Sequence, residues 1–246
     1  MDKALFISMS GAKETRLSQR AHMNNLANVN TDGFRADMAQ QRAMSVFGDG
    51  FPSRAYAMSE RPATDFAPGP LITTGRDLDV AVNGVGWIAV QAPDGGEAYT
   101  RTASLEVNPL GQLLTADGRQ VLGNNGPIAL PPFQKMDIDK DGTISIIPQG
   151  QTPELVVVAD RIKLVSPDET QLRKGLDGLV RRGDGGVEPA NAAITLTPGV
   201  LEASNVNPVV EMVSVIDAAR QYDMNVRMMR EMSEVETAAS RLLQVG

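Results

Sequence analysis

Both ends of this chain favour long helices, and this feature restricts the possible folds more than any other. Residues 2–29 contain no proline and a single glycine, Gly11. Apolar residues recur there at steps of three or four, which gives the helix one apolar stripe. We therefore predict an N-terminal helix that stops at Asn30-Thr31-Asp32-Gly33, where turn formers precede a glycine that can adopt a left-handed conformation.

A second helix is predicted at the other end of the chain. Asn207 suits the N-cap, Pro208 the first helical position, and Glu211 the first turn, where the helix dipole favours an acidic side chain. We expect this helix to run to Leu243, a length of roughly 50 Å. Its apolar stripe consists of Val209, Met212, Ile216, Ala219, Tyr222, Val226 and Met229.

The segment between the helices has a different texture. Residues 35–75 contain four prolines and no sustained period, so we expect an extended link there. From residue 76 onward, short runs of strand-forming residues alternate with dipeptides that favour tight hairpin turns. These dipeptides are Asn83-Gly84, Asp94-Gly95, Asp117-Gly118, Asn125-Gly126, Asp141-Gly142, Asp177-Gly178 and Asp184-Gly185. The pattern predicts a compact all-β domain, sandwich-like or barrel-like.

The predicted fold class is therefore α+β. We expect an N-terminal helix with its cap (1–34), an extended linking segment (35–75), a β-rich domain (76–200) and a C-terminal helix (201–246). Each helix has an apolar stripe too long for one small β domain to cover, and an isolated helix gains little stability in water. We expect the two helices to pair in a coiled-coil-like layer that also packs against other copies of the chain.

Composition excludes several classes of protein. The net charge of -7 disfavours non-specific binding to nucleic acid or to anionic lipid. The absence of cysteine removes disulfides, zinc thiolate sites and cysteine nucleophiles. We find no apolar run long enough for a transmembrane helix, and the polar residues among the first 27 predict that no secretory signal peptide is cleaved.

One motif suggests a metal site. Asp137, Asp139 and Asp141 with Gly142 match the first half of a calcium-binding loop. The expected glutamate at position twelve is replaced by Pro148, and the flanking residues favour strands instead of helices. We interpret the segment as a hairpin turn between strands at 136–138 and 144–146, and we predict no metal and no cofactor.

The sequence offers no motif for catalysis. Gly84-Val85-Gly86 lacks the third glycine of a dinucleotide-binding loop and precedes a strand-like run. His22 is the only histidine, and its neighbours one turn away supply no acid-base partner. We find neither a nucleophile elbow nor a phosphate-binding loop. The chain is therefore predicted not to be an enzyme.

Asparagine is concentrated at the ends of both helices. Asn24, Asn25, Asn28 and Asn30 lie within seven residues, although asparagine is a poor residue for a helix interior. Capping explains Asn30 and Asn207 but not the adjacent pair Asn24 and Asn25. We interpret these amides as contacts between chains or as a shaped helix end.

These same residues carry a family resemblance. Residues 24–34, NNLANVNTDGF, resemble the N-terminal motif shared by bacterial flagellar rod and hook proteins. Residues 201–207, LEASNVN, with the following Val210-Glu211-Met212 and Arg220-Gln221-Tyr222, resemble the matching motif that opens their last helix. The likeness extends over nearly the whole chain and is greatest to the proximal rod type. One departure is Val85, where an acidic residue is common in the family.

The resemblance implies a mechanical function. It implies a structural subunit of the periplasm-spanning rod, exported by the flagellar type III apparatus, which assembles with proximal and distal rod subunits and transmits motor torque to the hook. We expect the chain neither to bind nucleic acid nor to insert directly into a membrane. We expect subunit interaction to involve Leu5, Met9, Ala12, Asn24, Asn25, Asn28, Asn30, Gly33, Phe34, Asn205, Asn207, Met212, Ile216, Ala219, Val226 and Met229.

Three alternatives remain open from the residues. The first is a distal rod or hook-type subunit of the same family. The second is a secreted β module stabilised by calcium at Asp137, Asp139 and Asp141. The third is a secreted hydrolase, which would need a polar cleft in the β domain. Neither of the last two explains the paired motifs at the two ends.

Overall fold

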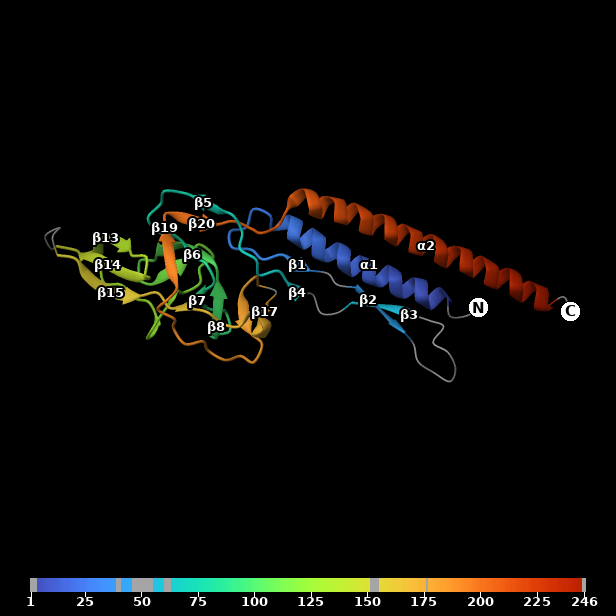
Figure 1. Cartoon of the computed structure of the whole chain (residues 1–246), viewed down its shortest axis with the longest axis horizontal. Helices are drawn as coiled ribbons and strands as arrows, with labels where there is room; N and C mark the ends of the chain where they lie inside the picture. The colour runs from blue at the N-terminus through green and yellow to red at the C-terminus, as the bar shows by residue number, and fades with distance from the viewer. Residues whose placement is uncertain are drawn as a thin grey trace. The chain divides into compact units, whose positions relative to one another are not determined.

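A computed structural model describes residues 4–38, 41–45, 55–59, 63–150, 155–175 and 177–244. Helix α1 (Ala4–Ala27) and helix α2 (Pro208–Gln244) lie near the two ends of the sequence, and the strands lie between them (Figure 1). This confirms the predicted mixture of α and β structure with a mostly β central region. The chain forms two compact units, one of Met1–Val29, Ala36–Asp65 and Val206–Gly246, the other of Asn30–Arg35 and Phe66–Asn205.

The first unit, here called the helical unit, contains both helices. The side chain of Asn207 accepts hydrogen bonds from the backbone N–H groups of Val209 at 3.1 Å and Val210 at 3.3 Å, so the predicted N-cap is confirmed. Short strands from the predicted linking segment also belong to this unit. They form two antiparallel pairs, β1 (Asp37–Met38) with β4 (Ala63–Thr64) and β2 (Gln41–Ser45) with β3 (Ala55–Ser59).

The second unit, here called the β unit, contains the remaining strands. Its two largest sheets have the orders β16-β7-β8-β18-β17 and β10-β9-β6-β19, and a third has the order β13-β14-β15. Two further pairs are β11-β12 and β20-β5. The bounds are β5 (Leu71–Thr73), β6 (Asp79–Asn83), β7 (Trp87–Gln91), β8 (Glu97–Thr100), β9 (Thr102–Val107), β10 (Leu113–Thr115), β11 (Leu122–Gly123), β12 (Gly126–Pro127), β13 (Phe133–Ile138), β14 (Thr143–Pro148), β15 (Val157–Arg161), β16 (Leu164–Val165), the 3₁₀ helix η1 (Glu169–Gln171), β17 (Leu172–Lys174), β18 (Val180–Arg182), β19 (Thr195–Pro198) and β20 (Val200–Glu202).

Strand β7 lies between two hydrophobic clusters. Its side chains alternate between the two faces of the sheet, because successive residues of a strand point in opposite directions. Ile88 and Val90 belong to the larger cluster, while Trp87 and Ala89 belong to the smaller one with Tyr99. Both faces of this strand are therefore covered, which explains its continuous apolar sequence.

The predicted turns are also present. Glycine has positive φ at all seven predicted turn dipeptides, at Gly84, Gly95, Gly118, Gly126, Gly142, Gly178 and Gly185. The turn at Gly142 joins β13 to β14, which pair in the register Met136↔Ile146 and Ile138↔Ile144. The hairpin predicted in place of a calcium loop is thus confirmed.

Candidate functional site

Helices α1 and α2 lie side by side and antiparallel (Figure 1). Near the end of α1, His22 Nδ1 lies 2.6 Å from Glu211 Oε2, and Asn25 Nδ2 donates to Glu211 Oε1 at 3.2 Å. Near its start, Ser8 Oγ lies 3.9 Å from Met228 Sδ and 3.8 Å from Met232 Sδ. Residues far apart in sequence thus form one continuous helix contact.

The buried side chains of α1 are small or polar. Among the described side chains of α1, the buried ones are Ser8, Ala12, Glu14, Thr15 and Asn25. On each helix, one set of buried and half-buried positions recurs at alternating steps of three and four. They are Ser8, Gly11, Thr15, Ser18, His22 and Asn25 on α1, and Glu211, Val215, Ala218, Tyr222, Asn225, Met229 and Met232 on α2. This set of positions is called the seam below.

The large apolar side chains of both helices remain largely exposed. On α1, Phe6 is 49% exposed and Met9 is 51% exposed. On the first three turns of α2, exposure is 67% for Val209, 52% for Met212 and 52% for Ile216. Exposed apolar patches of this kind mark interaction surfaces in soluble proteins. The helix pair therefore presents apolar surface outward, and α1 contributes only small and polar residues to the seam.

The predicted interaction residues on the helices do not share one face. Met9, Met212 and Ile216 are exposed, Ala12 is buried, and the others are half-buried, namely Leu5, Ala219, Val226 and Met229. The stripe predicted for α2 averages fewer than 3.6 residues per step, so it drifts around the helix from the exposed face to the seam. The spacing of apolar residues alone therefore did not show which members of the stripe are exposed and which lie in the seam.

Asn25 fixes the segment that follows α1. Its Oδ1 accepts from the backbone N–H of Asp37 at 2.8 Å, and its Nδ2 donates to the Asp37 carbonyl at 2.9 Å. The side-chain amide thus pairs with the backbone as a neighbouring strand would. Because Asn25 is 1% exposed, both bonds are shielded from water.

The other asparagines have local partners as well. Asn24 Nδ2 donates to Asp37 Oδ2 at 2.9 Å, and Asn28 Nδ2 donates to the Asn24 carbonyl at 2.8 Å. In the β unit, Asn30 is exposed. Asn205 Nδ2 there donates to the Ala67 carbonyl at 3.1 Å. The amides of Asn24, Asn25 and Asn28 thus shape the end of α1 within the chain.

Gly33 and Phe34 lie where the chain enters the β unit. Gly33 has a φ of 68°, as its predicted left-handed conformation requires, and its N–H donates to the Glu202 carbonyl at 2.6 Å. A Cβ at this position would lie 2.9 Å from Thr102 Cγ2, so a larger residue would clash as well as strain the backbone. Phe34 is buried, and Lys174 Nζ lies 3.7 Å from its ring centroid.

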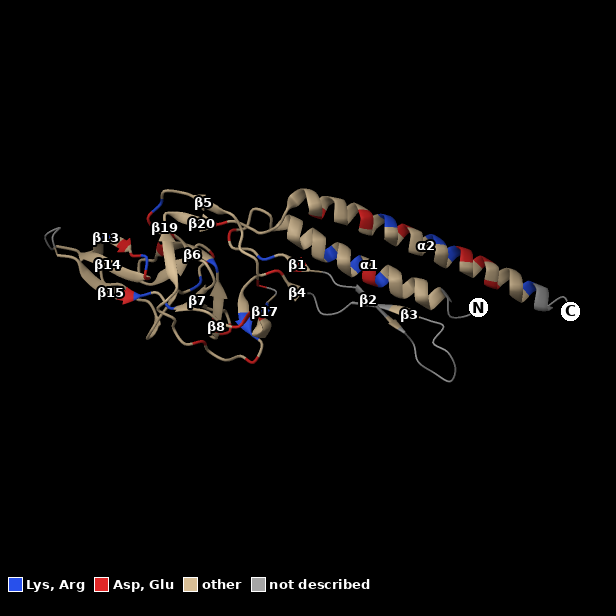
Figure 2. Ribbon diagram, viewed as in Figure 1, with Lys and Arg blue, Asp and Glu red and all other residues tan. Residues whose placement is uncertain are grey.

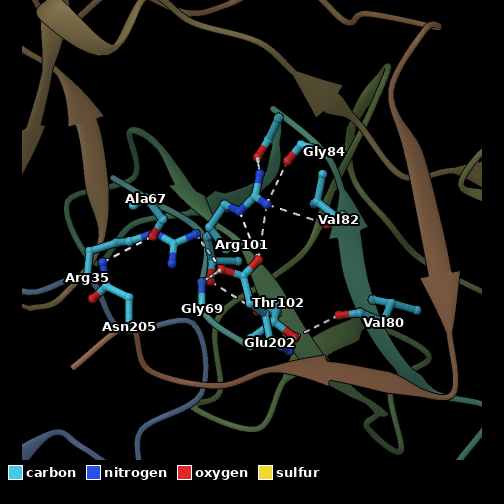
Figure 3. A network of polar contacts seen from close by, with 12 residues as sticks. Arg35, Ala67, Gly69, Val80, Val82, Gly84, Arg101, Thr102, Glu202 and Asn205 are labelled. Atoms are coloured by element: carbon cyan, nitrogen blue, oxygen red, sulfur yellow. Dashed lines mark hydrogen bonds and ion pairs between the residues drawn. The ribbon is translucent and has the colours of Figure 1, made fainter. Parts of the chain in front are cut away.

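A buried ionic network surrounds Glu202 at the end of β20 (Figure 3). One carboxylate oxygen accepts from Arg35 and from the Gly69 N–H at 2.9 Å, and the other accepts from Arg101 Nε at 3.1 Å. Glu202 is 0% exposed. The network joins three segments of the β unit that are distant in sequence, next to the points where the chain leaves this unit.

Both arginines of this network lie near the ring of Trp87. The Arg35 guanidinium is 5.9 Å from the Trp87 ring centroid, and that of Arg101 is 5.7 Å away. Arg101 also donates to the carbonyls of Gly84 and Gly86. Trp87 and Arg101 line a pocket of about 380 Å³. The network was not predicted from the sequence, because single arginines give no periodic signal. The available signs were the only tryptophan of the sequence and the glutamate inside the LEASNVN motif.

The carboxylates of the calcium-like motif have protein partners. Asp141 accepts from the backbone N–H of Thr143 at 3.0 Å and from its hydroxyl at 2.8 Å. Those two bonds and the nearby Arg161 hold the Asp141 pKa below its ordinary value. Asp137 pairs with Lys135 at 2.9 Å. Among the described residues, no group of three or more His, Asp or Glu is arranged to hold a metal ion.

Two family models match this sequence. Residues 197–242 match the model described as "Flagellar basal body rod FlgEFG protein C-terminal", and residues 81–146 match "Flagellar hook protein FlgE/F/G D1 domain". The first match covers most of α2. Neither described helix is apolar enough along its length to cross a bilayer.

Full-length relatives agree with these matches. The chain is 38% identical to the flagellar basal-body rod protein FlgF of Salmonella typhimurium over 100% of both chains. It is 34% identical to FlgF of Caulobacter vibrioides over 97% of both chains, and 31% identical to FlgG of Buchnera aphidicola, with 92% of this chain and 94% of that protein covered. The chain therefore belongs to the FlgF family of flagellar basal-body rod proteins, and is a structural subunit of the flagellum that assembles with other rod and hook components, not an enzyme.

Proposed function

We propose that the helical unit is the assembly surface of this rod subunit. In this proposal α1 and α2 pair in a coiled-coil-like layer along the seam, and their outward apolar side chains become buried against neighbouring rod subunits. One observation carries the proposal: α1 contributes small and polar residues to the seam, while Phe6, Met9, Val209, Met212 and Ile216 are about half or more exposed. Burial of such side chains is the main driving force for association.

The remaining segments have proposed mechanical roles. The β unit is sandwich-like or barrel-like in this proposal, and residues 35–75 bridge to neighbouring subunits. The network around Glu202 supports a mechanical role for the β unit, because it holds Arg35 and Glu202, near the points where the chain enters and leaves this unit, in fixed positions. Close-packed interiors resist compression, so a shaft built of such subunits transmits torque with little deformation.

The proposed location is the periplasmic rod, between proximal and distal rod subunits. We propose export by the flagellar type III apparatus without cleavage of a signal peptide, and no direct membrane insertion or nucleic acid binding. The polar first helix and the net charge of -7 support these proposals.

The test is a charge placed on the exposed apolar surface. Ile216→Asp is expected to remove the chain from isolated basal bodies and to abolish motility, because a carboxylate would be buried at the interface without a partner. Ile216 is 52% exposed, so the variant is expected to fold. Gln221→Asp, an exposed polar position on the same helix, is the matched control. Intact rods and normal motility with Ile216→Asp would refute the proposal.

A further inference from the structure

Methionine is concentrated in the helical unit. The sequence has twelve methionines, and all but Met136 belong to the segments of this unit. The core of the β unit is built mainly from valine, isoleucine, leucine and alanine. Methionine and leucine have similar helix propensity, so helix formation does not account for the difference. Methionine is suited instead to irregular contact surfaces, because its side chain is unbranched and flexible.

Four of these methionines, called the helix methionines below, are exposed on α1 or α2. They are Met9, Met23, Met212 and Met224, each between 51% and 60% exposed. The first three lie in stretches of the helices that have few charged residues (Figure 2). Met136, by contrast, is 5% exposed in the core of the β unit. In the dilute chain the thioethers of the helix methionines are therefore accessible to small solutes, whereas that of Met136 is not.

An exposed thioether is the group of this chain that hydrogen peroxide attacks first, because the sequence has no cysteine and Trp87 is buried. A lone pair of the methionine Sδ forms a bond to one peroxide oxygen, and the O–O bond breaks. The leaving hydroxide takes the proton of the transferred oxygen and becomes water. Methionine is thus oxidised by two electrons to the sulfoxide, and peroxide is reduced to water. The product is polar where the thioether was apolar.

We propose that the helix methionines are modification sites, and that their oxidation by hydrogen peroxide blocks incorporation of a subunit that is not yet assembled. This rests on the proposed function of the helices as the assembly surface. A sulfoxide oxygen buried at an apolar interface without a hydrogen-bond donor costs free energy, so an oxidised subunit binds its neighbours less tightly. Once a subunit is incorporated, the same side chains are buried and protected. A methionine sulfoxide reductase reverses the modification.

The first test compares oxidation rates of single methionines. Hydrogen peroxide is added to the purified full-length chain and to isolated basal bodies, and the sulfoxide at each position is measured by mass spectrometry. In the dilute chain the helix methionines are expected to react at least about tenfold faster than Met136, since reactivity follows exposure. In basal bodies they are expected to react about as slowly as Met136. Equal rates in the dilute chain would overturn the proposal, whereas fast oxidation within basal bodies would contradict the proposed function.

The second test removes the oxidisable groups. One variant has leucine at all four positions, with Met9→Leu, Met23→Leu, Met212→Leu and Met224→Leu, and the matched control is Met136→Leu. Leucine has a similar volume and helix propensity, so both variants are expected to fold, which circular dichroism checks. Each is expressed in cells that lack the native gene, with and without hydrogen peroxide while rods assemble. The amount of the chain in isolated basal bodies is then measured, and treated cells are compared with untreated cells.

Peroxide is expected to lower incorporation about tenfold for the wild-type chain and for Met136→Leu, and less than about twofold for the variant with four leucines. An equal loss in all three would overturn the proposal, because oxidation of other proteins would then account for it. Full incorporation of a wild-type chain that has sulfoxide at the helix methionines would overturn it as well. Absence of the untreated wild-type chain from basal bodies would instead contradict the proposed function.

Discussion

The two units of this chain bury their apolar residues to different extents. In the β unit, Ile88, Leu105, Leu113 and Ile144 are each 0% exposed. In the helical unit, the buried hydrophobic residues described are Ala12, Val206 and Ala218. Several of the large apolar side chains of that unit are about half exposed, among them Phe6, Met9 and Ile216. The β unit therefore has a closed core of its own, whereas the helical unit leaves much of its apolar surface exposed.

The largest expected effect concerns the ionic network of the β unit. Glu202→Ala would leave two arginines, which are 2% and 4% exposed, without their shared carboxylate. We expect a loss of about 3–5 kcal/mol in the free energy of unfolding, measured by urea denaturation. The matched control is Asp184→Ala, which breaks a more exposed pair with Arg182 and should therefore have a much smaller effect on the free energy of unfolding. Equal effects would show that burial of the network contributes nothing.

A pair of isoleucine substitutions compares the two units directly. Ile144→Ala in the β core should cost about 2–5 kcal/mol of unfolding free energy, because it removes buried atoms and leaves a cavity. Ile216→Ala on α2 should change it by less than about 0.5 kcal/mol in the dilute chain, because the residue is 52% exposed. A large loss for Ile216→Ala would mean that α2 already packs this side chain within one copy.

Asn25 tests how firmly the helical unit is held internally. Asn25→Ala removes both bonds to the Asp37 backbone and should cost about 1–3 kcal/mol, since a buried backbone pair is left unmade. Asn24→Ala, on the exposed side, should cost less than about 0.5 kcal/mol. Increased hydrogen exchange around residue 37 in the first variant only would confirm the difference.

The smallest effect concerns a surface pair of the β unit. Hydrogen bonds from Arg181 lower the pKa of Asp177 from 3.8 to about 2. Because the folded-state pKa is the lower one, the pair stabilises the fold above pH 3.8, and the contribution is lost as pH falls towards 2. Asp177→Asn should therefore cost at most about 1 kcal/mol at neutral pH and almost nothing near pH 2. A cost independent of pH would contradict this account.

The sequence predicted features that depend on neighbouring residues. The helix start at Asn207, the positive φ of Gly33 and the hairpin at Gly142 all follow from local backbone preferences, and all three are confirmed. The division of α2 into seam and outward faces was not predicted, because a spacing of three or four residues fits more than one adjacent face.

The contacts between distant segments could not be predicted either. Glu202, Arg35 and Arg101 are separated by 66 residues or more, and nothing in their local sequence pairs them. Asn25 stands out in the sequence because asparagine is a poor residue for a helix interior. Its partner, however, is the backbone of Asp37, and a backbone group has no sequence signature. Such contacts are set by how the strands and helices come together, not by propensity.

Hydrogen exchange on the dilute, purified chain tests the central claim most directly. We predict rapid exchange in α1 and α2 and slow exchange in strands β6, β7 and β9, because the β unit has a closed core and the helices await partners. Slow exchange throughout both helices, at the level of β7, would contradict the account, since it would mean that a single copy already stabilises the surface assigned here to assembly.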